Sequence, residues 1–299
     1  MKLMLRSLKL VALMLSAQLV MGQGTTKEGY SLMWDRTLAV VPDSMSNGKH
    51  KLPAWTVSVF EGDASEILDM WKADMKALST AVTGSKPAKA TDARLGIGEH
   101  AVLTLATAAT EKKAKLVRLT IAFAMNDSTP LASPAGQEEY MRGLAIKYNK
   151  AVVQRQIDVK EAALAKVGGK LADAQADEVK LKQKADKAKS ALAKVKAKRA
   201  KVEANNAEIQ GTIVGLEKKF ALTNDPKDLQ RLTKTRQKLA DGEKGIAKLM
   251  QSEAKAQANI NKYESQLPET TADQQGQTVS KEQLQSEIQA LKRKQDSIR

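Results

Sequence analysis

Between Leu164 and Phe220 the chain carries an apolar repeat whose spacings alternate between three and four residues. The repeat covers seventeen successive a and d positions of a heptad, and fourteen of them are apolar. Only a supercoiled helix keeps a 3.5-residue repeat facing one partner, so the pattern predicts a coiled coil. Its seam includes Leu164, Leu171, Leu181, Leu192, Val195, Val202, Ile209, Ile213 and Leu216. A seam is a structural element, and it points to no reaction.

A second helix is predicted to return along the first. Asn224-Asp225-Pro226 stops the first helix and starts the next, with Pro226 at the first helical position. A short turn near residues 223–226 between two heptad helices predicts an antiparallel hairpin over residues 134–267. The second helix is marked by Leu229, Leu232, Leu239, Ile246, Met250, Ile260 and Leu267.

The charges beside the seam favour this hairpin over a parallel homodimer. In a parallel pair, lysines at the e and g positions of the first helix would face lysines of the second copy. The returning helix instead offers small neutral residues at its assigned e and g positions, namely Thr233, Thr235, Ala240, Gly242, Ala247 and Ala254. The expected register places Arg199 against Glu253 and Asn206 opposite Ile246.

The C-terminal part is predicted to be a linker followed by a short helix. Pro268 is expected to end the second helix, and the polar residues 268–279 are expected to form a flexible linker. Ser280 then caps a last helix over residues 280–299.

Residues 23–133 are predicted to form a separate head domain. This segment holds all three Trp residues, and its 13 basic side chains nearly balance its 12 acidic ones. Alternation of apolar and polar residues predicts strands at 37–41, 55–59, 103–106 and 115–125. Asp63 begins a helix with an apolar stripe, residues 83–92 read as a loop, and Ser133-Pro134 begin the long helix. The predicted fold is therefore an α+β head with one helix on an antiparallel sheet, followed by the coiled-coil hairpin.

The N-terminus has the layout of a secretory signal peptide over residues 1–22. Lys2, Arg6 and Lys9 precede an apolar run, and small residues precede Gln23. The run is shorter than the roughly 20 apolar residues that a membrane span needs. We therefore expect an exported protein, periplasmic or extracellular.

The residue types of common catalytic and metal sites are sparse. The chain has no cysteine, and His50 and His100 are its only histidines. A zinc site needs three or four converging ligands, and Gly96-Ile97-Gly98 precedes a predicted strand where a dinucleotide-binding loop needs a helix. We therefore predict no catalytic residue, no metal, no cofactor and no small-molecule substrate.

A lysine-rich run offers the strongest indication of function. Residues 180–201 hold nine Lys residues and Arg199 against one acid, Asp186. The run is either a solvated face of the hairpin or an anion-binding surface, with binding assigned to Lys180, Lys182, Lys184, Lys189, Lys196 and Lys198. Export and the absence of aromatic residues from the run argue against nucleic acid.

Two resemblances accompany these patterns. The basic, Ala- and Lys-rich hairpin resembles the arms of the periplasmic chaperone Skp (OmpH) family. The head, in its segment Val57-Ser58-Val59-Phe60-Glu61-Gly62, together with the hairpin resembles a set of uncharacterised exported bacterial proteins. The first resemblance implies a holdase that grips unfolded envelope proteins, and the second implies no particular activity.

The sequence as a whole predicts a non-enzymatic scaffold or adaptor of the cell envelope. Its expected partners are envelope proteins, anionic envelope polymers or a lipid surface, and an oligomer through the head or hairpin is open. The alternative is a periplasmic holdase-type chaperone, which would need exposed apolar surface between its arms.

Overall fold

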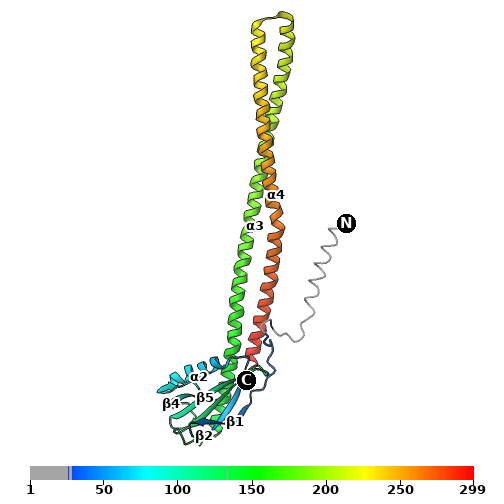
Figure 1. The fold of residues 1–299 in the computed structure, drawn as a ribbon. Coiled ribbons are helices and arrows are strands. Elements are labelled where there is room, and N and C mark those ends of the chain that lie inside the picture. Colours follow the sequence, from blue (N-terminus) through cyan, green and yellow to red (C-terminus); the bar gives the residue numbers. More distant parts are fainter. Residues whose placement is uncertain (1–25, 27–28, 133) are drawn as a thin grey trace. The chain divides into compact units, whose positions relative to one another are not determined.

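The computed structural model describes residue 26, residues 29–132 and residues 134–299. The predicted signal peptide at 1–22 and Ser133 lie outside these residues. The chain divides into one unit formed by the head with residues up to Leu164 and from Gln283 onward, and a second unit spanning Ala165–Glu282. The elements are β1 (Val40–Asn47), β2 (His50–Phe60), α2 (Ala64–Leu78), β3 (Ala81–Thr83), β4 (Ala88–Ala93), β5 (Val102–Glu111), β6 (Leu116–Ala124), α3 (Pro134–Thr223) and α4 (Pro226–Asp296) (Figure 1).

The head contains one six-stranded sheet in the order β1-β2-β6-β5-β4-β3, with every pair antiparallel. Strand β6 shows why these residues form a central strand. Its odd-numbered residues from Val117 to Phe123 enter one apolar cluster, while Ala122 and Ala124 enter a second. Side chains alternate across a strand, so both faces of this strand are covered.

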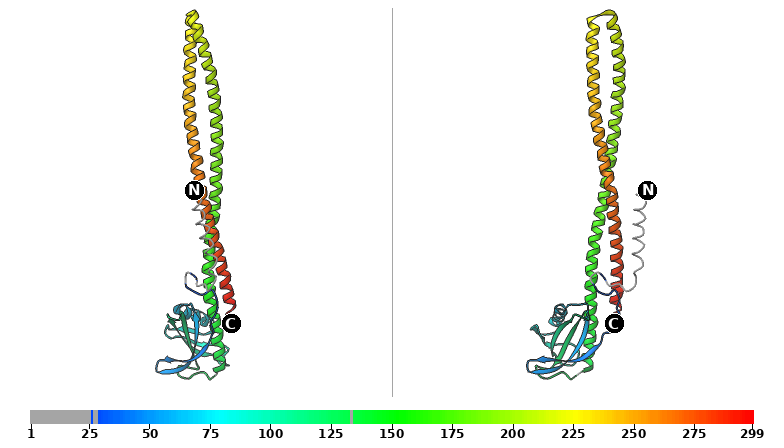
Figure 2. Two further views of the ribbon diagram at one scale, coloured as in Figure 1. Left: turned by 90° about the vertical axis from the view of Figure 1, so that its right-hand side faces the viewer. Right: turned by 45° about the vertical axis from the view of Figure 1, so that its right-hand side comes forward.

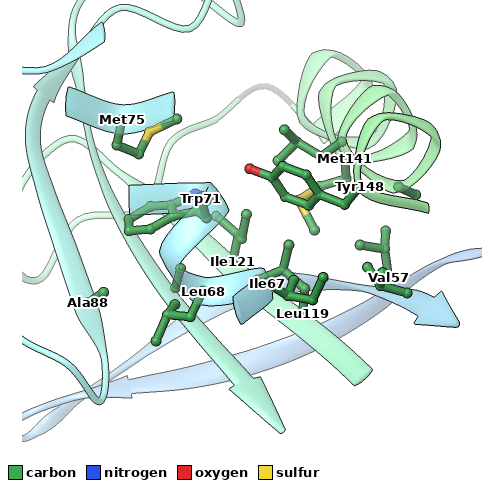
Figure 3. Packing of buried hydrophobic residues seen from close by; sticks show 14 of the residues in the cluster. Val57, Ile67, Leu68, Trp71, Met75, Ala88, Leu119, Ile121, Met141 and Tyr148 are labelled. Atoms are coloured by element: carbon green, nitrogen blue, oxygen red, sulfur yellow. The ribbon is translucent and has the colours of Figure 1, made fainter. Parts of the chain in front are cut away.

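Two helices pack on the first face of the sheet, where one was predicted. Helix α2 contributes Ile67, Trp71 and Met75, each fully buried. The start of α3 adds Met141 and Tyr148, whose side chains lie over the same core (Figure 3). The sequence pattern of residues 134–164 indicates a helix of the hairpin, and it does not show that the start of this helix also covers the sheet.

Polar contacts fix the start of α3 against the rest of the head. Asn149 is 1% exposed, its Oδ1 accepts from Phe60 N at 2.9 Å, and its Nδ2 donates to Ser58 O at 3.0 Å. Strand β6 pairs with β2 as far as Phe60, but β1 pairs with it only as far as Val57. On the β1 side, Asn149 therefore supplies partners to Ser58 and Phe60. The Tyr148 hydroxyl donates to Asp74 at 2.9 Å, and burial raises the pKa of Tyr148 far above its usual value, which keeps the proton on this donor.

The C-terminus belongs to the same unit as the head. Ile288, Leu291 and Ile298 are buried against Val153 and Ile157 of α3. Lys294, with a side chain 2% exposed, donates to Ser31 O at 2.6 Å and pairs with Glu61 at 2.7 Å. The last turns of α4 therefore tie together three separate segments of this unit.

The structure corrects several expectations for the head. Residues 83–92 are not a loop, because they include the end of β3 and most of β4, whose buried residues are alanines and so lack the usual strand markers. The strand expected to end before Pro42 is β1, which continues to Asn47. Proline is tolerated there because β1 is an edge strand.

The C-terminal expectation is also wrong. Helix α4 runs unbroken from Pro226 to Asp296, so residues 268–279 are not a linker and residues 280–299 are not a separate helix. Pro268 lies inside α4, where it removes one backbone donor without ending the helix. Helix α3 likewise continues through Gly168 and Gly169.

Replacing Asn149 tests the junction of α3 with β2. The Asn149→Ala variant leaves Phe60 N and Ser58 O, both in half-buried residues, without the partners that Asn149 supplies, at a cost of about 1–3 kcal/mol. We expect the free energy of unfolding to fall by about this amount in a urea titration monitored by Trp fluorescence. The matched variant Gln154→Ala removes an exposed amide of the same helix and should change stability by less than about 0.5 kcal/mol. Equal effects of the two substitutions would contradict the assignment.

Candidate anion-binding surface on the helical hairpin

Within the second unit, burial along α3 follows the heptad. Every a and d position from 167 to 220 is half-buried or buried, with Ala185, Asn206 and Ile213 the most buried. Almost every other residue of this segment is exposed. In the two views of Figure 2, α3 and α4 lie side by side along the hairpin. This arrangement agrees with an antiparallel coiled coil.

Burial along α4 keeps the same spacing from Asp228 to Glu282. The seam of this helix includes Thr235 and Gly242, which the sequence analysis had placed beside the seam, whereas Met250 is 54% exposed. The predicted linker also lies on the seam, through polar residues at 270, 274 and 277. Pro268 predicted the end of the helix, and the polar seam residues beyond it, which form no apolar repeat, predicted a linker.

The register of the hairpin agrees with the predicted contact of Arg199 with Glu253. Arg199 Nη1 lies 3.0 Å from Glu253 Oε2, and both side chains are shielded, at 31% and 13% exposed. Asn206 contacts Gly242, one turn from the predicted Ile246, and a Cβ at position 242 would collide with the Asn206 side chain. Further along, Gln274 Nε2 donates to Glu178 Oε2 at 2.8 Å. In two of these three layers, polar side chains of the two helices therefore meet one another.

The turn of the hairpin begins α4 as predicted. Asp225 Oδ1 accepts from Lys227 N at 2.8 Å, which is the contact of an N-cap residue, and Pro226 is the first helical residue. Lys219 of α3 pairs with Asp228, whose side chain is 2% exposed.

One side of the hairpin carries ion pairs, two of which join the helices. This side carries the e positions of α3, where Lys189 lies 2.8 Å from Glu264 and Glu217 lies 2.6 Å from Arg236. The adjacent Glu264 carboxylate raises the pKa of Lys189. Lys182, at the same heptad position, pairs with Glu178, and this lysine together with Gln274 lowers the pKa of Glu178.

A surface cavity of about 310 Å³ lies on the opposite side of the hairpin and shows which residues of the two helices share that side. Both helices contribute to it, with Lys180 and Lys184 from α3 and Gln266 and Glu269 from α4. Residues seven positions away along each helix lie on this same side, because the burial repeat continues unchanged. Forward from Lys180 in steps of seven, positions 187, 194 and 201 are all lysines. Backward from Glu269 in steps of seven, positions 262, 255 and 248 are also all lysines.

We name this surface the lysine face. It consists of Lys184, Lys187, Lys194, Lys198 and Lys201 of α3 and Lys248, Lys255 and Lys262 of α4. All eight residues are exposed. Between residues 184 and 201 and between 245 and 262, the remaining positions of this side are Ala191, Gly245, Ser252 and Asn259. The lysine face therefore contains no acidic residue.

No ion pair of a lysine-face residue is found in the described part of the chain, and Lys184 lies 6.0 Å from the centre of the Tyr263 ring. Exposed ammonium groups of like charge repel one another over distances near the Debye length of about 8–10 Å. An anionic partner would relieve this repulsion, so the surface is suited to binding anions.

The six lysines proposed from sequence divide between the two sides. Lys184 and Lys198 belong to the lysine face, and Lys180 lies beside it, 3.0 Å from Asp177. Lys182, Lys189 and Lys196 lie on the other side. The lysines of α4 were missed, although their seven-residue spacing at 248, 255 and 262 is visible in the sequence.

A concavity of about 380 Å³ lies in the head beside Trp34, Phe60 and Glu61. Its Glu61 carboxylate is already occupied, because it accepts from Ser31 N at 2.8 Å, Gln156 at 3.0 Å and Lys294 at 2.7 Å. These contacts hold segments together, so we assign the cavity a structural origin.

Within the described residues, no group of three or more His, Cys, Asp or Glu side chains is arranged to hold a metal ion. No helix among them has the length and apolar character needed to cross a bilayer. The chain matches no protein-family model, and no curated protein shows significant similarity to it.

Two glycine substitutions test the register. Alanine stabilises a helix by about 0.5–1 kcal/mol relative to glycine, and a Cβ at Gly245 meets nothing within 4 Å. We therefore expect Gly245→Ala to raise the midpoint of urea unfolding. Gly242→Ala should lower it instead, because the new methyl group displaces the buried Asn206 at a cost of about 1–3 kcal/mol.

The test depends on whether the two substitutions shift the midpoint of urea unfolding in opposite directions. Stabilisation by both substitutions to the same extent would mean that Gly242 does not face Asn206. Circular dichroism of the two variants would show that helix content is unchanged.

Proposed function

We propose that this protein is a non-enzymatic scaffold or adaptor of the cell envelope, and that the hairpin is its interaction element. The observation that supports this function is the charge asymmetry of the hairpin. On one side, Lys189 and Glu217 pair with charges of α4 and Lys182 pairs with Glu178, while the lysine face leaves eight exposed cations without acids among them. A stalk that served only as a spacer would have no need of this separation.

The proposed partners are envelope proteins or anionic polymers and surfaces of the envelope. Nucleic acid and small-molecule substrates are not part of the proposal, and neither is a resident cofactor. The proposed location outside the cytoplasm depends on the signal-peptide pattern of residues 1–22.

A holdase chaperone is the competing function. A holdase binds its clients through accessible apolar surface, whereas the apolar residues of this seam, such as Ile213 and Ile260, are buried between the helices. Among the described residues of α3 and α4, Val159, Val179, Met250 and Val279 are exposed at separate places along the helices, and Val214, Leu222 and Leu229 are exposed near the turn. This distribution favours the scaffold.

Two measurements test the proposed function. Expressed with its N-terminal segment in a bacterial host, the protein should be exported and cut near Gln23, and N-terminal sequencing of the periplasmic or secreted fraction checks this. Intact protein that begins at Met1 and is retained in the membrane fraction would contradict export.

The second measurement separates scaffold from holdase. Light scattering of a chemically denatured outer-membrane protein, diluted with and without the chain, should show unchanged aggregation. Suppression of aggregation at equimolar chain would instead favour the chaperone. A known holdase in the same assay provides the positive control.

A further inference from the structure

We propose that the lysine face binds a linear polyanion that lies along the hairpin. This inference rests on the proposed function and specifies the chemistry of the partner. The bound polymer would carry regularly repeated phosphate or carboxylate groups, and several lysines of both helices would contact it at once.

Lysines of the two helices lie at matching levels along the face, and we call one lysine of α3 and one of α4 at the same level a cross-pair. Lys184 contacts the Tyr263 ring, and Lys189 pairs with Glu264, so Lys187 lies within about one turn of the level of Lys262. A step of seven residues forward on α3 and seven back on α4 gives Lys194 with Lys255, and the next step gives Lys201 with Lys248.

The spacing of these cross-pairs follows from helix geometry. At 1.5 Å per residue, neighbouring cross-pairs are about 10 Å apart, and the face from Lys184 to Lys201 extends for about 26 Å. This length suits many consecutive charges of an extended polymer. A single phosphate or carboxylate would contact only one or two of the lysines.

The remaining residues of the face argue against a lipid bilayer. A helix that lies on a membrane inserts apolar or aromatic side chains between the headgroups. Here the residues between the lysines are Ala191, Gly245, Ser252 and Asn259, and the apolar stripes of both helices are used in the seam. Attraction is therefore electrostatic, without an apolar contribution.

The residue types also indicate how selective the face is. Every cation on it is a lysine, which acts as a point charge and lacks the fixed fork with which arginine recognises one phosphate or carboxylate. Polymer length and charge density should therefore set the affinity. Binding releases counterions, so affinity should fall steeply as salt rises.

The test compares two triple variants with the same change in net charge. The face variant is Lys187→Gln, Lys194→Gln and Lys255→Gln, and the control is Lys182→Gln, Lys189→Gln and Lys196→Gln on the opposite side. Glutamine resembles lysine in helix propensity, and circular dichroism checks that helicity is retained. The probe is fluorescently labelled long-chain polyphosphate, titrated at several salt concentrations.

We expect the wild type and the control to bind the long polymer with similar Kd. The face variant should bind about tenfold or more weakly at low salt, with a shallower dependence of log Kd on log salt because fewer counterions are released. Tripolyphosphate should compete poorly, since it spans only a small part of the face.

Three outcomes would overturn the inference. Equal weakening of both triple variants would mean that only net charge matters, and absence of polymer binding by the wild type at low salt would remove the partner. Tighter binding to vesicles with anionic headgroups than to the polymer would assign the face to a membrane. Sedimentation of the same variants with isolated envelopes reports on the proposed function separately, because an adaptor that binds only proteins would still sediment when polymer binding is absent.

Discussion

The meeting of Arg199 with Glu253 in the seam sets the alignment of α3 with α4, and the other features of the hairpin depend on it. Both side chains are partly shielded from water, with Nη1 and Oε2 3.0 Å apart. A slip of one heptad would set Arg199 against an apolar residue and leave Glu253 unpaired. Separating a shielded ion pair costs several kcal/mol in fully buried sites and less where the side chains reach water. Apolar layers alone would tolerate such a slip more easily.

Other polar residues of the seam also favour this alignment of α3 with α4. Asn206 fits beside Gly242 because glycine leaves room for its side chain, and Gln274 donates to Glu178. Asn206 therefore has space beside α4, and Glu178 has a polar partner on it. Buried polar residues commonly fix the register of coiled coils at some cost in stability. The alignment in turn brings the lysines of α4 beside those of α3.

The sequence predicted the hairpin well because its signals are local and periodic. The a and d positions of α3, the Asp225-Pro226 start of α4 and the contact of Arg199 with Glu253 could all be read from spacing and charge. Residues 268–279 were misjudged because proline, glycine and threonine weaken the intrinsic preference for a helix. In the structure this segment remains helical, and its seam residue Gln274 donates to Ala174 O and Glu178 Oε2 of α3.

The head was predicted less completely because its fold depends on contacts distant in sequence. Strand β4 is defined by small buried alanines, and Asn149 completes β2 from a helix about 90 residues later. Of the candidate site, the sequence predicted the basic run of α3 but not the lysines of α4. Charge density identified the basic run, but only the pairing of the two helices distinguishes Lys189, which has an acidic neighbour, from Lys194, which lies on the lysine face.

The alignment of α3 with α4 can be measured directly, since the chain has no cysteine of its own. Under mild oxidation, Asn206→Cys combined with Gly242→Cys should form an intramolecular disulfide, detected by a mobility shift on non-reducing gels. Asn206→Cys combined with Leu249→Cys, one heptad away, should remain reduced. Rapid crosslinking of the second pair in place of the first would contradict the alignment and, with it, the arrangement of the lysine face.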